Sequence, residues 1–244
     1  MDLNDKSIRD AQEYLLSDGT PLLKGYANVL LNTSSVDSLE RWIRDKTPKF
    51  SFSETVEALE ILDSLAYQDC PAGELAITRI VELQDEDGGW GKQLSMNDRL
   101  SLTGQVAGLL AKSPFSPGRS LRAGDSFFED HWSEKRVRSG SLVDIDVYFH
   151  WLANYPGELA DEALQWCGRE LTRGFRSGNF GPLATGRIFV RCGARALPGA
   201  SVSSREVCEK LIKTQRQDGS FFEPYIGSEV ASTGVALSIF FNLS

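Results

Sequence analysis

Two stretches of this sequence share one pattern, Gln-x-x-Asp-Gly-x-aromatic: QDEDGGW at Gln84–Trp90 and QRQDGSF at Gln215–Phe221. Each stretch follows a run in which apolar residues recur at helical spacing. Each is followed by a polar loop and a small-residue apolar segment with a Thr-Gly pair, Thr103-Gly104 or Thr233-Gly234. Asp-Gly predicts a sharp end to the preceding helix, because glycine adopts a positive φ at low cost. The pattern therefore marks a repeated pair of helices.

Four weaker copies of this arrangement fill the rest of the chain. They lie at Ser17-Asp18-Gly19, Phe50-Ser51-Phe52, Ser139-Gly140 and Ser177–Phe180. The first helices of the six pairs are expected at 7–17, 35–46, 72–84, 120–135, 158–173 and 203–216. The second helices are expected to begin near residues 22, 54, 98, 142, 183 and 229. No segment shows the apolar–polar alternation of a strand over more than a few residues.

Six helical hairpins of about 40 residues thus account for nearly the whole chain. An open array of hairpins needs polar terminal repeats, whereas six hairpins can close into a ring. In such a ring the first helix of each pair lies outside, and the second, richer in small residues, lines the centre. The sequence predicts one all-α domain over residues 1–244, a six-hairpin α/α toroid barrel with outer and inner helices.

The composition excludes several classes of partner. The chain has 244 residues, 34 of them acidic and 26 basic, for a net charge of −8. Because no cluster of Lys and Arg stands out, nucleic acid is not an expected partner. No apolar run approaches the roughly 18–20 residues of a membrane span, and the polar N-terminus is not a signal peptide. Four irregularly spaced cysteines are typical of a reduced compartment, so we expect a cytoplasmic protein without a membrane span.

The repeated pattern resembles that of the terpene cyclases and the protein prenyltransferase β-subunits, which form the α/α toroid superfamily. The chain is most similar to the barrel domain of class II terpene cyclases of the squalene–hopene cyclase type. The resemblance covers the whole chain through the weaker copies, and it implies that Trp90 and Phe221 pack neighbouring hairpins together. Since one fold hosts several chemistries, the activity depends on the site.

The fourth hairpin contains the sequence LVDIDVYFHW at Leu142–Trp151. Class II terpene cyclases carry Asp-x-Asp-Asp at the start of an inner helix, where the middle aspartic acid protonates an alkene or epoxide. By this resemblance Asp144 is the first acid and Asp146 the catalytic acid, while Val147 stands in place of the last acid. Protein prenyltransferases instead place a zinc-binding Asp-x-Cys pair near this point, with a later histidine. Asp146 occupies that cysteine position and no histidine follows His150, so no metal site is expected.

The residues themselves support an acid at this place. Protonating an alkene needs a carboxylic acid that is uncharged at rest, and burial beside a second carboxylate favours that form. Asp144 and Asp146 are two residues apart, so we expect both to reach one volume at the helix start. On a helix His150 shares a face with Asp146 and would orient or reprotonate it. Tyr148 and Trp151 are candidate substrate-binding residues, because aromatic faces attract cationic intermediates.

Acids also stand at the starts of other inner helices, where they would share one barrel mouth. Glu54, Asp98 and Glu229 are therefore further candidates for substrate binding. A purely structural role stays open for all of these acids, because acidic residues cap helix N-termini and favour the helix dipole. The sequence has no Asp-Asp-x-x-Asp motif, so no cofactor is expected, and Mg²⁺ would enter only with a diphosphate substrate.

The leading hypothesis is a class II terpene cyclase-like isomerase or lyase that cyclises an isoprenoid, with Asp146 as general acid. Family members usually build the cavity between two barrels, so a second helical-barrel subunit or a second copy of this chain would cover the mouth. The alternative is a non-catalytic toroid that binds an apolar ligand or a partner protein, as one subunit of a larger cyclase. A glycan-active enzyme that uses two carboxylates is a third hypothesis.

Overall fold

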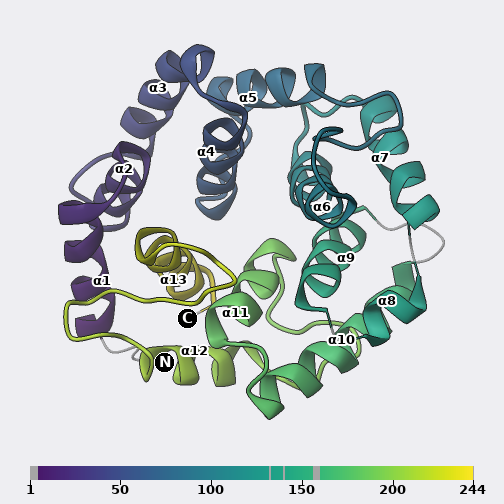
Figure 1. Ribbon diagram of the computed structural model, residues 1–244. Helices are drawn as coiled ribbons and strands as arrows, with labels where there is room; N and C mark the ends of the chain where they lie inside the picture. The colour runs from purple at the N-terminus through teal and green to yellow at the C-terminus, as the bar shows by residue number, and fades with distance from the viewer. Residues whose placement is uncertain (1–4, 132, 140, 156–159, 244) are drawn as a thin grey trace. The chain divides into compact units, whose positions relative to one another are not determined.

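The computed structural model describes residues 5–131, 133–139, 141–155 and 160–243, which form thirteen α-helices, one short 3-10 helix and no β-strand (Figure 1). The helices are α1 (Asp5–Asp18), α2 (Pro21–Leu30), α3 (Val36–Lys46), α4 (Phe52–Ser64), α5 (Pro71–Glu82), α6 (Met96–Lys112), α7 (Gly118–His131), α8 (Glu134–Arg138), α9 (Leu142–Asn154), α10 (Ala160–Ser177), α11 (Pro182–Arg191), α12 (Ser204–Ile212) and α13 (Glu229–Leu243). The 3-10 helix, η1, spans Thr47–Lys49. The predicted all-α class is confirmed.

A helix is found at each of the twelve positions expected from the six hairpins. One expected helix is divided, since the segment 120–135 forms α7, which ends at His131, and α8, which begins at Glu134. His131 Nδ1 donates to the carbonyl of Phe127 at 2.6 Å and so binds one of the last acceptors of α7. Gly140 and the expected helix start at residue 158 lie outside the described residues.

The same device starts α4, α6, α9 and α12. In each helix a serine at the N-cap accepts a hydrogen bond from the backbone N–H of an acidic residue three positions later. The pairs are Ser51 with Glu54, Ser95 with Asp98, Ser141 with Asp144 and Ser203 with Glu206. In α4 and α12 the side chain of the acidic residue also accepts a hydrogen bond from the backbone N–H of the serine, which completes a capping box. Each cap is worth about 0.5–2 kcal/mol.

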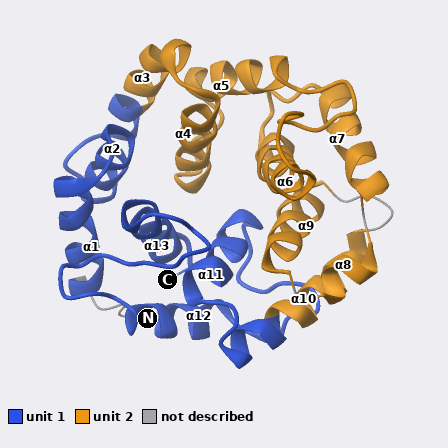
Figure 2. Ribbon diagram, in the orientation of Figure 1, with its two compact units in different colours: residues 1–39, 172–244 blue, residues 40–171 orange. Residues whose placement is uncertain are grey.

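The chain divides into two compact units (Figure 2). Unit 1 comprises residues 1–39 and 172–244, and within it α13 packs on α1, α11 and α12. Unit 2 comprises residues 40–171, and within it α6 packs on α4, α7 and α9. Of the helices that the structure describes, none has both the length and the apolar character that crossing a bilayer requires.

Candidate functional site

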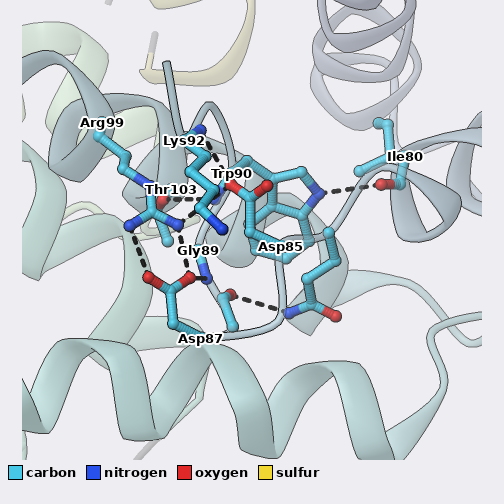
Figure 3. A network of polar contacts seen from close by, with 10 residues as sticks. Ile80, Asp85, Asp87, Gly89, Trp90, Lys92, Arg99 and Thr103 are labelled. Carbon is cyan, nitrogen blue, oxygen red and sulfur yellow. Dashed lines mark hydrogen bonds and ion pairs between the residues drawn. The ribbon is translucent and has the colours of Figure 1, made fainter. Parts of the chain in front are cut away.

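The first copy of the repeated pattern forms a turn that is hydrogen-bonded to α5, α6 and α7 (Figure 3). The backbone N–H of Trp90 donates to Thr103 Oγ1 of α6 at 3.0 Å, and its indole donates to the carbonyl of Ile80 in α5 at 2.9 Å. The Gln84 amide donates to the carbonyl of Ser120 in α7 at 3.0 Å. These contacts join one hairpin to the first helix of the next hairpin.

The second copy makes the same contacts in unit 1. The backbone N–H of Phe221 donates to Thr233 Oγ1 of α13 at 3.0 Å. The Gln215 amide donates to the carbonyl of Ser7 in α1 at 2.7 Å. The sixth hairpin therefore binds the first hairpin as the third binds the fourth.

The glycines of the two copies show that even the register is the same. Gly88 and Gly219 have φ angles of +89° and +84°, which favour glycine. A Cβ on Gly88 would lie 2.0 Å from the carbonyl oxygen of Ala123, and one on Gly219 would lie 2.3 Å from that of Asp10. Each of these carbonyls comes three residues after the serine that binds the glutamine, so both turns meet the following helix at equivalent positions.

An ion pair is also repeated, with its charges exchanged. In the first copy Arg99 binds Asp85 at 3.0 Å and also binds Asp87 (Figure 3). In the second copy Arg216 occupies the position of Asp85, and it binds Glu229, which occupies the position of Arg99. Glu229, a candidate for substrate binding, thus takes part in this ion pair.

Helix α9 separates the two acids of the candidate site. The helix begins at Leu142, so both acids lie within it, and residues two apart on a helix point about 160° away from each other. Asp144 Oδ1 accepts from Arg136 of α8, at 3.1 Å from Nε and 2.9 Å from Nη2. The backbone N–H of Asp144 also donates to the Ser141 cap. Contrary to expectation, the segment is helical rather than extended, so the Asp144 and Asp146 side chains leave the helix in nearly opposite directions.

Asp146 and His150 lie one turn apart on α9 and are both buried, with exposed fractions of 3% and 0%. The face that carries His150 meets α6, where a Cβ on Gly108 would lie 2.4 Å from His150 Cδ2. A Cβ on Gly104 would lie 2.4 Å from Val147 Cγ1. Val147, which replaces the last acid of the motif, thus packs against the backbone of α6.

The two glycines of α6 were not recognised from the sequence as part of the site. Gly104 and Gly108 are four residues apart, which places them on one helix face and lets another helix approach closely. This spacing was the signal in the sequence, but it does not reveal which side chains fill the space.

Tyr148 and Trp151 join α9 to α7. The Tyr148 hydroxyl donates to the carbonyl of His131 at 3.0 Å, and the Trp151 indole donates to Asp125 Oδ1 at 3.2 Å. Both side chains are buried, and burial raises the pKa of Tyr148. Burial likewise raises the pKa of Asp125, against the effect of the indole hydrogen bond. The polar atoms of both aromatic residues therefore bind α7.

Glu54 and Asp98 act as helix caps. Glu54 Oε2 accepts from the Ser51 N–H at 2.7 Å and from its hydroxyl at 2.6 Å, and these bonds lower the pKa of the carboxyl. Asp98 Oδ2 accepts from the Ser95 hydroxyl at 2.6 Å. Both acids are exposed. Their contacts are thus those of helix caps, the structural role that the sequence left open for these acids.

Among the described residues, no group of three or more His, Cys, Asp and Glu side chains could hold a metal ion. Comparison of the chain with models of known families, with curated proteins and with solved structures found no match.

Proposed function

We propose that the six hairpins close into an α/α toroid of the terpene cyclase type. The support comes from the two copies of the repeated pattern. Gln84 binds the outer helix of the next hairpin, and Gln215, in the last hairpin, binds the outer helix of the first. In an open array the last copy would have no following helix to bind.

We further propose that this toroid protonates an isoprenoid, with Asp146 as the general acid of a class II cyclase-like isomerase or lyase. The observation that carries the proposal is the burial of Asp146 beside His150 on one face of α9. Removing a carboxylate from water costs several kcal/mol. Burial therefore favours the neutral acid, which is the form that can protonate an alkene.

The other candidate acids have contacts that suit a structural role. Glu54 and Asp98 are exposed caps, and Asp144 binds Arg136.

In the proposed reaction the Asp146 O–H bond breaks, its proton forms a C–H or O–H bond on the substrate, and the resulting cation cyclises. A proton then leaves the cation, so the overall change is an isomerisation. His150, on the same face, would return a proton to the acid.

The test compares Asp146→Asn with the matched variant Asp144→Asn. Each protein is incubated in D₂O with squalene, oxidosqualene, or farnesyl or geranylgeranyl diphosphate with Mg²⁺, and products are identified by mass spectrometry. We expect the wild type to form a cyclic product carrying deuterium, and Asp146→Asn to lose about 100-fold or more in turnover. Absence of turnover in the wild type, or equal turnover in Asp146→Asn, would contradict the proposal.

One observation favours a second candidate, a non-catalytic toroid that binds an apolar ligand or a partner protein. Val147 replaces the last acid of the motif and packs on Gly104, so α6 occupies the space beside that position. For such a protein, squalene or farnesol would change the tryptophan fluorescence equally in the wild type and in Asp146→Asn, without turnover. If neither ligand binds and the chain copurifies with no helical-barrel subunit, this candidate is excluded.

A further inference from the structure

The imidazole of His150 lies directly on the backbone of α6. A Cβ built on Gly108 would stand 2.4 Å from Cδ2, 2.5 Å from Cγ and 2.6 Å from Nε2 of the ring. Three atoms of one rigid ring therefore occupy the space that any other residue at position 108 would fill. The His150 side chain is fully buried, so the ring cannot move away without displacing other packed groups.

We infer that Gly108 is a positioning residue that fixes the orientation of the His150 imidazole, an inference that rests on the proposed role of Asp146. The proposed reaction needs His150 to present one ring nitrogen to a proton-transfer partner at a defined angle. Contact with the flat backbone at Gly108 restricts rotation of the ring about its side-chain bonds. Gly108 touches no substrate and acts through His150.

Gly104 provides a matched control on the same helix. Its Cβ would stand 2.4 Å from Val147 Cγ1, an overlap of equal severity with an apolar side chain that takes no part in proton transfer. Substituting alanine at either position forces α6 and α9 apart by a similar amount. A purely structural role for Gly108 therefore predicts the same behaviour for Gly104→Ala and Gly108→Ala.

Histidine NMR separates the two roles, because the chain contains two histidines, His131 and His150. With ¹⁵N-labelled histidine, we expect Gly108→Ala to shift both ring nitrogen signals of His150 while those of His131 stay in place. Gly104→Ala should shift the His150 signals much less than Gly108→Ala does, although it lowers the unfolding temperature by a similar amount. Equal shifts of the His150 signals in the two variants, or no shift in Gly108→Ala, would overturn the inference.

Turnover gives a second readout. We expect Gly108→Ala to lower kcat by about 100-fold, as a misplacement of about 1 Å does, while KM stays within a few-fold. In a His150→Asn background, Gly108→Ala should lower kcat no further, because the group through which it acts has gone. The shorter asparagine also relieves the overlap, so this double variant serves if Gly108→Ala does not fold. An additional loss of kcat in that background would refute the positioning role.

If Asp146→Asn keeps full turnover, the proposed function fails, whereas the NMR comparison still decides the role of Gly108.

Discussion

At the scale of single residues, the exchanged ion pair shows that the two motif copies keep an interaction and not a residue type. Asp85 binds Arg99 in one copy, and Arg216 binds Glu229 in the other. Each pair connects the residue after the motif glutamine with the first turns of the following helix, α6 or α13. The two copies thus form the same ion pair with the positions of the two charges reversed.

Exchanging the first pair tests this equivalence. The Arg99 side chain is only 7% exposed, so Arg99→Glu should destabilise by more than the ~1 kcal/mol of an exposed pair and approach the ~3–5 kcal/mol of a broken buried pair. Adding Asp85→Arg should restore part of this loss. Urea unfolding of the two single variants and the double variant gives the coupling free energy. Strictly additive effects would show that the pair is not a unit.

Stability in acid depends on a neighbouring carboxyl. Hydrogen bonds from Arg99 lower the pKa of Asp87 from 3.8 to about 2. Because the folded pKa is the lower one, this stabilisation is complete above about pH 4 and is lost as the pH falls through about 2. The difference in unfolding free energy between the wild type and Asp87→Asn should therefore shrink across that range. A constant difference from pH 6 to pH 2 would contradict the assignment.

The partner of Asp144 illustrates what the sequence could not predict at this scale. The sequence predicts that Asp144 is a candidate acid or a helix cap. Its ion pair with Arg136, however, depends on the break between α7 and α8, which the helical pattern did not predict. Ion pairs between helices follow from tertiary packing, so a single sequence rarely reveals them.

At the scale of helices, the sequence predicted positions better than faces. Apolar spacing placed α4, α9 and α12 within a few residues of their observed bounds. The sequence did not predict which side of α9 packs on which neighbouring helix. Nearly every residue of α9 is buried, so its pattern shows no polar side that would orient the helix. The glycines of α6 show that the side of α9 with Val147 and His150 packs on α6.

A variant at the start of α4 tests the role of Glu54. We expect Ser51→Ala and Glu54→Ala each to lower the unfolding free energy by about 0.5–2 kcal/mol through loss of the capping box, with turnover unchanged. Ser53→Ala, in the same turn, should have a smaller effect on stability. Weaker substrate binding in Glu54→Ala at unchanged stability would return Glu54 to the binding site.

At the scale of the whole chain, the two glutamines offer the sharpest test of the proposed closure. Gln84→Ala and Gln215→Ala each leave two carbonyls without the amide donor, so each should cost about 1–3 kcal/mol. If the array is closed, the two losses should be similar in thermal or urea unfolding. A negligible effect of Gln215→Ala beside a large effect of Gln84→Ala would argue for an open array.

Circular permutation tests the same proposal independently. New termini placed between α6 and α7, with the original ends joined by a flexible Gly/Ser linker, should give a folded protein, because Gln84 would then hold the new ends together. Helix content and a cooperative unfolding transition by circular dichroism are the measurements. A permuted chain that lacks cooperative unfolding would contradict closure.

The contact between Gln215 and Ser7 has a consequence for biosynthesis. These residues are 208 positions apart, so Ser7 is translated long before Gln215, to which it is bound in the folded chain. Until then the apolar side of α1 lacks α13, on which it packs in the finished protein. A nascent chain that stalls before residue 215 would thus expose α1 to proteases and chaperones.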